Sequence, residues 1–278
     1  MNIYEEIISD VKASGIFVDK EIAAERICVG VHYTCVKLSN GKAGLCCSCA
    51  KDQLRDEGRD EGKDEGKDEF INSFSGPAEL EGKPALELAG YAGSSNILKS
   101  VIGAATLNAL MASMPQFDGD NFANSCRGDT LSLLNIKSSD TVSMVGAFPP
   151  YTAKLKGLVK KLYVIDKDPD IEICEGFPVV RGEEAYKTIS GSDVVIITAV
   201  TFANATLEGL LEILVPGQRA ALVGPSVAPY AAPFFKRGIT LLSGSLVTDS
   251  DKAMSTASCG GNVHALKNYA RKINILKS

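Results

Sequence analysis

The side chains best suited to binding a small ligand stand at the ends of apolar segments of the sequence. Asp166 ends the apolar segment at residues 162–166, and an acid at this place in a parallel sheet is the usual acceptor for ribose hydroxyls. Asn204 and Thr206 follow the apolar segment at residues 193–199, and convergent amide and hydroxyl groups can orient a polar ligand. These residue types indicate a nucleoside-bearing ligand such as S-adenosylmethionine. The structural alternatives stay open, because Asp166 could cap its loop and Asn204 or Thr206 could cap the next helix.

The segment after residues 141–147 limits which cofactor the protein could hold. A dinucleotide cradle requires Gly-x-Gly-x-x-Gly, so that backbone N–H groups face a pyrophosphate. Here Gly146 is followed by Pro149 and Pro150, which carry no N–H. The pattern argues against a conventional NAD or FAD site.

A tight turn, Gly224-Pro225-Ser226, could present the hydroxyl of Ser226 at the end of residues 219–224. The sequence has no Gly-x-Ser-x-Gly elbow and no plausible third member of a catalytic triad. An activated serine nucleophile is therefore not predicted at this turn.

The eight cysteines raise the question of a metal site. Cys46 and Cys49 form a Cys-x-x-Cys, but no second such pair and no histidine pair completes a zinc pattern. Cys259 and His264 are five residues apart, whereas a helical pair on one face needs a spacing of three or four. These four residues are the metal candidates, and buried hydrophobic thiols are the alternative. We expect a structural role for His32 among apolar neighbours on a predicted strand.

Composition excludes several classes of protein. The chain has 278 residues, 45% of them hydrophobic, and a net charge of −5, so the clustered positive charge of a nucleic-acid binder is not expected. No basic and apolar leader is visible, and no apolar run reaches the roughly 18 residues of a transmembrane helix. The sequence predicts a soluble cytoplasmic protein with reduced thiols, and it leaves a homo-oligomer open.

Residues 55–69 form an acidic tetrapeptide repeat. They contain four basic and eight acidic residues, so they hold −4 of the net charge of −5. A glycine at every fourth position opposes helix formation, and there is almost nothing apolar to bury, which predicts a surface loop. Metal capture by its carboxylates is the alternative, although the ligand spacing of a calcium loop is missing.

The first half of the chain predicts a small α+β domain. The predicted elements are a helix at residues 2–14, strands at 26–38 and 43–50, and a helical stretch at 84–114. A Ser-Asn-Gly-Lys turn at residues 39–42 should join the two strands. Gly90 and Gly93 should break the helical stretch, and Ser94 or Ser95 should cap its second part.

The second half alternates five apolar segments with amphipathic ones, the pattern of a parallel sheet covered on both faces. The predicted strands lie at residues 141–147, 162–166, 193–199, 219–224 and 239–243. The predicted helices lie at residues 151–161, 182–190, 206–214 and 229–237, with a last one near 261–273. Right-handed crossovers favour a Rossmann-like doubly wound domain with strand order 3-2-1-4-5, which binds ligands at the carboxyl edge. We therefore predict two domains, 1–137 and 138–278.

Six segments, taken together, resemble the heavy-metal-chelation family, long classed as a domain of unknown function. They lie at residues 102–110, 145–150, 165–169, 201–206, 223–226 and 243–249. The resemblance covers nearly the whole chain except the acidic repeat. It implies a smaller N-terminal domain with an enolase N-terminal-like fold before a Rossmann-like one, and a site in the cleft between them. It also implies some likeness to methyltransferases, and a role in making or handling a metal-chelating small molecule.

Carried over residue by residue, the resemblance singles out ten positions of this chain. They are Asn108, Gly146, Pro149, Asp166, Asn204, Thr206, Gly224, Pro225, Ser226 and Asp249. In an enzyme, Asp249 would be the best available general acid or base, and Ser226 would orient the substrate beside it as the second catalytic candidate. The other eight would bind substrate or cofactor.

Three functions are compatible with these features. The first is an enzyme that condenses, hydrolyses or transfers a group on a small polar or heterocyclic molecule. The second is a carrier that binds a metal or a metal complex directly. The third is an S-adenosylmethionine-dependent methyltransferase.

Overall fold

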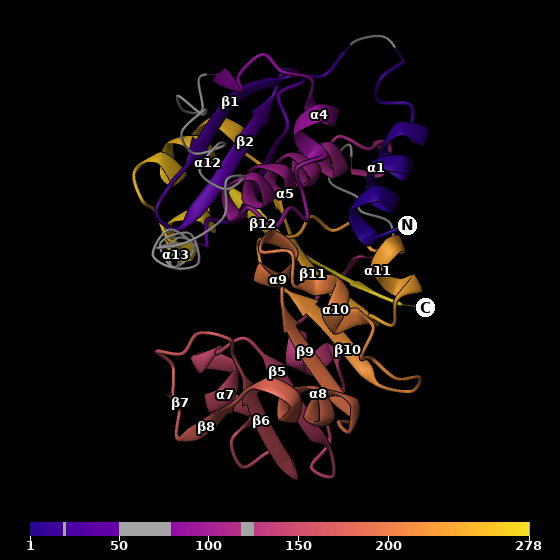
Figure 1. The fold of residues 1–278 in the computed structure, drawn as a ribbon, viewed down its shortest axis with the longest axis vertical. Coiled ribbons are helices and arrows are strands. Elements are labelled where there is room, and N and C mark those ends of the chain that lie inside the picture. The colour runs from indigo at the N-terminus through magenta and orange to yellow at the C-terminus, as the bar shows by residue number, and fades with distance from the viewer. Residues whose placement is uncertain (19–20, 50–78, 118–124, 278) are drawn as a thin grey trace, which may run out of the picture.

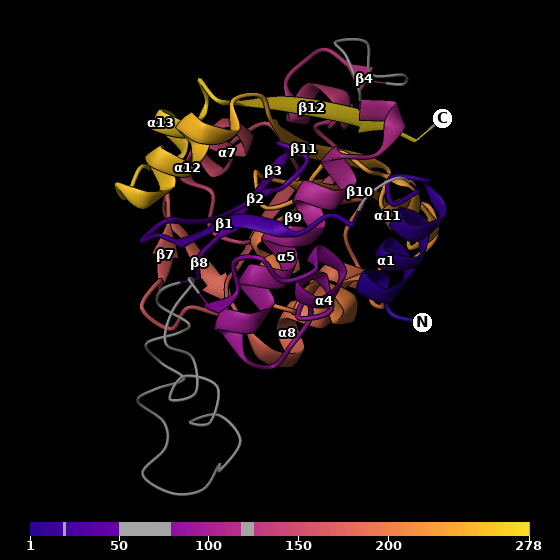
Figure 2. The same ribbon diagram turned by 90° about the horizontal axis from the view of Figure 1, so that it is seen from above.

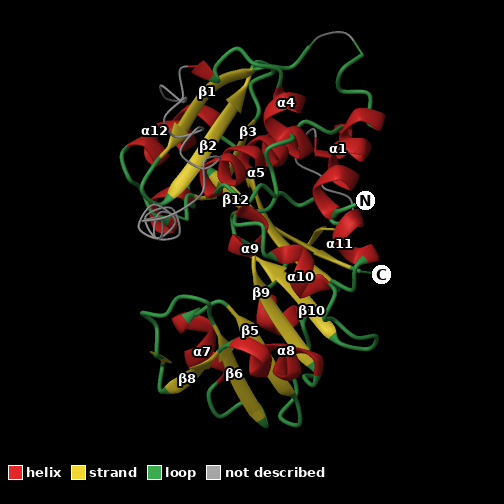
Figure 3. Ribbon diagram, viewed as in Figure 1, coloured by secondary structure: helices red, strands yellow, loops and turns green. Residues whose placement is uncertain are grey.

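A computed structural model describes residues 1–18, 21–49, 79–117 and 125–277 (Figure 1). The acidic repeat at residues 55–69 lies outside the described residues, so its prediction as a surface loop stays a prediction. The described chain forms one nine-stranded sheet and one separate three-stranded sheet. The elements of the three-stranded sheet gather at one end of the molecule, and β5, β6 and β8 lie at the other (Figures 1 and 3).

The nine-stranded sheet is mostly parallel, as predicted for the second half. Its parallel strands are β5 (Thr141–Val145), β6 (Lys161–Ile165), β8 (Phe177–Val180), β9 (Val194–Thr198), β10 (Arg219–Val223) and β11 (Leu241–Val247). Three short or peripheral strands pair antiparallel: β4 (Ser125–Cys126), β7 (Ile173–Cys174) and β12 (Ala270–Leu276). The order across the sheet is β4-β12-β11-β10-β9-β5-β6-β8-β7.

The strand order corrects one detail of the prediction. The five predicted strands, in chain order, are β5, β6, β9, β10 and β11. They run 2-1-3-4-5 across the sheet, because β9, the third of them, lies next to β5. The order 3-2-1-4-5 returns once β8 is counted as the third strand, since β8 pairs with β6 in parallel. Strand β8 was not predicted, because its Phe-Pro-Val-Val segment is short and its proline removes one ladder donor.

Helices cover both faces of this sheet (Figure 2). They are α6 (Thr130–Leu133), α7 (Pro149–Leu155), α8 (Gly182–Ser190), α9 (Val200–Ala203), α10 (Leu207–Leu211) and α11 (Ala232–Lys236). Two more helices, α12 (Ser250–Ser258) and α13 (Val263–Leu266), pack instead with the three-stranded sheet. The helix predicted near 261–273 is wrong beyond the short α13, because residues 270–276 pair with β11 instead. The predicted boundary after residue 137 stays a prediction; β4 and α6 precede it, and β4 already pairs with β12.

The first half of the chain builds the three-stranded sheet β1 (Ala24–Val29), β2 (Tyr33–Leu38) and β3 (Ala43–Cys47). Its helices are α1 (Ile3–Ala13), α4 (Ala85–Ala89) and α5 (Ile97–Ala112), followed by the 3-10 turn η2 (Pro115–Phe117). The strand predicted at 26–38 is two strands, with His32 exposed in the turn between them, so its assignment to a strand was wrong. Asn96, rather than Ser94 or Ser95, caps α5 by accepting from the Lys99 N–H.

Helix α5 packs closely on β3 and is almost completely buried. A Cβ on Gly44 of β3 would lie only 2.1 Å from the carbonyl oxygen of Ala105, so only glycine permits this approach. Because small residues fill the helix, its backbone can lie against both the small sheet and α9. The Ser100 hydroxyl on α5 donates to the Ala203 carbonyl at the end of α9, at 2.7 Å.

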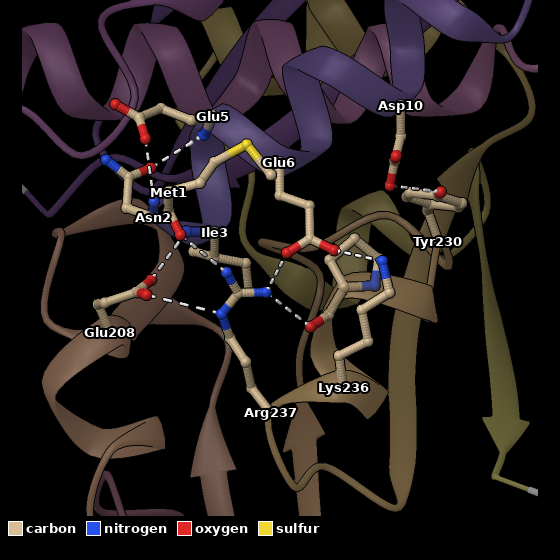
Figure 4. A network of polar contacts seen from close by, with 11 residues as sticks. Met1, Asn2, Ile3, Glu5, Glu6, Asp10, Glu208, Tyr230, Lys236 and Arg237 are labelled. Carbon is tan, nitrogen blue, oxygen red and sulfur yellow. Dashed lines mark hydrogen bonds and ion pairs between the residues drawn. The ribbon is translucent and has the colours of Figure 1, made fainter.

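A polar cluster fastens α1 to α10 and α11 (Figure 4). Glu6 accepts hydrogen bonds from both Lys236 and Arg237, and its side chain is only 9% exposed. The bond from Lys236, together with Arg237, lowers the pKa of the Glu6 carboxyl. Glu208 accepts from the backbone N–H of Ile3 at 3.0 Å and pairs with Arg237 at 3.6 Å. In Figure 2, α1 and α11 lie side by side.

Within the described ranges, none of the helices combines the length and the apolar character that a bilayer crossing needs.

Candidate functional site

A cavity of about 700 Å³ lies at the carboxyl ends of β5, β6 and β9. Its described lining residues all fall between Val145 and Leu210, so they come from the sheet edge, the loop after β6, and helices α8, α9 and α10. This is the place where the connections from β5 and β9 leave in opposite directions across the sheet. Ligands of doubly wound sheets bind at such a switch point.

Asp166 lines this cavity at the end of β6. Its Oδ2 accepts from the Ala147 N–H at 2.8 Å and its Oδ1 from the Asp168 N–H at 2.9 Å. Each carboxylate oxygen has two acceptor positions, so the two bonds fix the orientation of the carboxylate and leave one position on each oxygen. The two interpretations left open by the sequence are therefore compatible, since one carboxylate holds its loop and also lines the cavity.

Gly146, at the end of β5, brings the backbone close to β9. Its φ is +99°, and a Cβ there would lie 2.9 Å from the side chain of Thr198. Pro149 and Pro150 then open α7 and supply no N–H, and neither of them lines the cavity. The start of α7 therefore holds two residues without the N–H groups that a pyrophosphate cradle would use.

Asn204 and Thr206 line the cavity from the α9–α10 turn, with Thr201 beside them. The amide orientation that satisfies both ends of Asn204 has its nitrogen donating to Thr206 Oγ1 at 2.7 Å and to the Thr201 carbonyl at 3.3 Å. Its oxygen then accepts from Lys167 Nζ at 3.2 Å. Neither Asn204 nor Thr206 caps α10 through its side chain in the usual way, because the N-cap Thr206 makes no such bond. Thr201, Asn204 and Thr206 therefore bond to one another while all three line the cavity.

Arg181 and Tyr186 also line the cavity, and neither was predicted from the sequence. The guanidinium of Arg181 donates to the carbonyl oxygens of Asp168, at 2.7 Å, and Ile171, and so holds the loop after β6. These residues follow β8, so recognition of that strand would have placed them at the sheet edge. Tyr186, Phe148 and Ile189 add apolar and aromatic side chains to the lining of the cavity.

Two family models with the description "Putative heavy-metal chelation" match this chain. The DUF364 model matches residues 129–276, more than half of the chain, and the DUF4213 model matches residues 13–111. The chain belongs to the DUF364 family. The cavity described above lies wholly within the part that the DUF364 model matches.

Solved DUF364 structures share this fold. A protein of unknown function from Desulfitobacterium hafniense has a TM-score of 0.69 at 21% identity, over 98% of this chain and 99% of that one. One from Pyrococcus horikoshii has a TM-score of 0.71 at 18% identity, over 97% and 99% of the two chains. An uncharacterized protein of Methanocaldococcus jannaschii is 27% identical over 169 residues, which are 60% of this chain and 62% of that protein. This chain therefore spans less than two thirds of that curated relative.

Two of the positions singled out by the DUF364 resemblance lie in the core rather than in the cavity. Asn108 on α5 donates to the carbonyls of Leu45 and Ser226 and accepts from the Ala228 N–H, at 2.8–2.9 Å. Ser226 is 0% exposed, and its Oγ accepts from the Cys47 N–H at 2.9 Å. Both side chains join the small sheet to the loop after β10. This placement does not support the predicted catalytic role of Ser226 or ligand binding by Asn108.

The remaining positions are spread along the carboxyl edge. Gly224 and Pro225 line a second, smaller cavity, and Pro149 is exposed on α7. Asp249 caps α12 by accepting from the Lys252 N–H at 3.1 Å, and it does not line the 700 Å³ cavity. The Lys252 side chain bonds to the carboxyl group and lowers its pKa. A lowered pKa does not favour Asp249 as a general acid, and its role as a general base stays a prediction.

The predicted location between two domains is not confirmed. Among the described residues, none before Val145 lines the 700 Å³ cavity. The N-terminal elements contact the cavity-lining helix α9 instead, since the Tyr4 hydroxyl donates to the Phe202 carbonyl at 2.9 Å. Together with the Ser100 bond, this contact positions the helix that carries Thr201.

The metal candidates do not form a ligand set in the described chain. The Cys46 thiol is fully buried and donates to the Val101 carbonyl, and burial raises its pKa well above the usual value. Burial also raises the pKa of Cys35 to about 12. Cys259 and His264 are both exposed. Over the ranges that the structure describes, no group of three or more His, Cys, Asp or Glu side chains could hold a metal ion.

Proposed function

We propose that the protein binds a nucleoside-bearing small molecule in the 700 Å³ cavity and acts there as a group-transferring enzyme on a small polar partner. The placement of Asp166 carries this proposal. Its carboxylate lies at the end of the second strand of a Rossmann-like sheet, lines the cavity and is held by two backbone N–H groups. Carboxylates in this position accept hydrogen bonds from ribose hydroxyls.

The rest of the cavity supports a ligand without a pyrophosphate. Phe148, Tyr186 and Ile189 supply apolar surface for a heterocyclic base, and Asn204 and Thr206 supply polar groups in the same lining. The two prolines at the start of α7 carry no N–H to face a diphosphate. These residues suit S-adenosylmethionine, which supplies a transferable methyl group when it is bound.

The family description fits this activity if the product is itself a metal ligand. Methylation or another group transfer would then modify a chelating small molecule, and metal handling would be indirect. Direct metal binding by the described residues is not part of the proposal, because the Cys46 thiol is buried with a raised pKa and no three donor side chains of the described residues group together.

Calorimetric titration tests the proposal. S-adenosylmethionine, its demethylated product and adenosine should each bind the wild type, and Asp166→Ala should weaken binding at least about tenfold through loss of two charge-assisted bonds. Asp170→Ala is the matched control, since Asp170 is exposed in the same loop and does not line the cavity. No binding at millimolar ligand, or equal losses in both variants, would contradict the proposal.

Direct metal binding is tested separately. Metal analysis of the purified protein should show no stoichiometric zinc, nickel or copper that is lost when Cys46, Cys47 and Cys49 are changed together to Ser. Stoichiometric metal that disappears in this triple variant would favour the carrier function instead.

A further inference from the structure

A second cavity, of about 300 Å³, lies at the carboxyl ends of β10 and β11. Tyr151 of α7 lines it, whereas Phe148, just before α7, lines the larger cavity. The two rings stack with their centroids 5.6 Å apart, so the pair lies between the two cavities. The small cavity is therefore a neighbour of the proposed nucleoside site and has its own walls.

The charges of this cavity all have one sign. Lys267 and Lys272 line it, and no acidic residue appears among its described lining residues. Leu45, Val223 and Leu266 provide apolar walls. A ligand that fits such a lining has an apolar body and a negative charge.

The β11–β12 pairing places a hydroxyl-bearing residue, Ser245, directly opposite Lys272. Ser245 and Lys272 are direct partners across the two strands, and both line the cavity. Side chains of directly opposed residues lie on the same face of a sheet. The Ser245 hydroxyl makes no side-chain hydrogen bond within the described ranges, so it is available to a ligand.

A chain of hydrogen bonds holds the ammonium in place. Lys272 Nζ donates to Thr130 Oγ1 at 2.7 Å, and Thr130 shares a bond of 3.2 Å with Ser243. Ser243 donates to Asn274 Oδ1 at 2.8 Å, and the Asn274 amide donates to the Gly128 carbonyl at 3.1 Å. An ammonium has three donors, so two remain after the bond to Thr130.

Among the described residues, no carboxylate lies at ion-pair distance from this ammonium, although Asp129 acts on it from farther away. In the described part of the chain, Lys272 forms no ion pair, and the nearby Asp129 pairs with Lys154 at 3.6 Å. Desolvation lowers the pKa of the Lys272 ammonium, which an anionic partner would raise again. The side chain keeps contact with solvent, so a ligand can reach it.

We infer that this cavity binds a small molecule with an apolar body and one carboxylate, whose oxygens accept hydrogen bonds from Lys272 and Ser245. The inference concerns a ligand other than the proposed nucleoside, and it does not depend on that proposal. The stacked Phe148 and Tyr151 rings place the two ligands side by side at one edge of the sheet.

Benzoate and its neutral analogue benzamide are the probes. Calorimetry or ligand-observed NMR should show that the wild type binds benzoate at least about tenfold more tightly than benzamide, the value of one charge-assisted contact. Lys272→Met should remove this preference, and Lys160→Met, a change at an exposed lysine in the turn before β6, should keep it. No benzoate binding at millimolar concentration, equal binding of the two probes, or an unchanged preference in Lys272→Met would overturn the inference.

Chemical labelling of the wild type keeps the inference testable if Lys272→Met does not fold. Trinitrobenzenesulfonate should modify Lys272, mapped by mass spectrometry, and benzoate but not benzamide should slow this modification relative to that of Lys160. Equal protection by both probes, or none, would overturn the site. Adenosine binding should persist in Lys272→Met, so failure of this inference and failure of the proposed function give different results.

Discussion

Two polar clusters of this molecule have similar composition and opposite character. The cluster around Glu6 joins α1 to α10 and α11, and its acids Glu6 and Glu208 pair with the bases Lys236 and Arg237 (Figure 4). The cluster around Asp166 surrounds a cavity, and its carboxylate is held by backbone N–H groups. In the first cluster, the acids bond to basic side chains of the protein. In the second, Asp166 bonds only to backbone N–H groups and keeps acceptor positions while it lines the cavity. The comparison teaches that pairing, more than residue type, separates a structural cluster from a candidate site.

The two clusters are linked through α9 and α10. Glu208, at the start of α10, takes part in the Glu6 cluster, and Gly209 and Leu210 of the same helix line the cavity. Tyr4 on α1 also donates to α9. The cluster around Glu6 therefore positions the part of the cavity lining that α10 supplies, although Glu6 and Glu208 do not line the cavity themselves.

The largest effect is expected at Glu6. Glu6→Ala leaves Arg237, whose side chain is only 19% exposed, without its main partner, and should lower the free energy of unfolding by about 2–3 kcal/mol. Urea denaturation measures this loss. Glu183→Ala, which removes an exposed 3.9 Å pair with Lys187, should cost less than about 0.5 kcal/mol. Similar losses in the two variants would remove the distinction between the clusters.

A smaller effect is expected at Gly146, where fold and cavity meet. Gly146→Ala should lower the free energy of unfolding by about 1–2 kcal/mol, because a φ of +99° strains any residue with a Cβ. It should also weaken ligand binding, because the new Cβ displaces Thr198 at 2.9 Å. Gly157→Ala, at φ +76° with no atom within 4 Å, is the control. Gly157→Ala should lose stability and keep its affinity for the ligand. An equal loss of affinity in Gly157→Ala would show that backbone strain alone explains the weaker binding of Gly146→Ala.

The smallest effect is a pH dependence of the Glu6 cluster. The folded-state pKa of Glu6 is lowered from its usual 4.5, chiefly by the bond from Lys236, so the unfolded state binds its proton first as pH falls. Its contribution is complete above the unfolded pKa and is lost as pH falls through the folded one. The stability difference between wild type and Glu6→Ala, measured by denaturation at each pH, should therefore shrink below about pH 4.5. A constant difference down to acid pH would show that Glu6 acts through packing alone.

The sequence predicted those features that local pattern determines. Continuous apolar segments placed the central strands, and the predicted helix at 182–190 is α8 as observed. The expectation of ligand groups at the carboxyl edge rests on the same pattern, and Asp166, Asn204 and Thr206 do line one cavity.

Features that depend on distant contacts were not predictable in this way. Residues 270–276 form a strand because β11 pairs with them, and their own sequence does not exclude a helix. Asn108 and Ser226 are polar groups beside apolar runs, as Asn204 is, but inside the core Asn108 donates to the Ser226 carbonyl and the Ser226 hydroxyl accepts from the Cys47 N–H. Only the folded arrangement distinguishes a polar residue that joins two sheets from one that faces a cavity.

The most direct test of the account compares adenosine with 2′,3′-dideoxyadenosine in calorimetric titrations of wild type and Asp166→Ala. If Asp166 accepts hydrogen bonds from ribose hydroxyls, loss of these hydroxyls should weaken wild-type binding at least about tenfold and should change binding to Asp166→Ala little. Equal discrimination between the two nucleosides by both proteins, or no binding of either nucleoside to the wild type, would contradict the central claim.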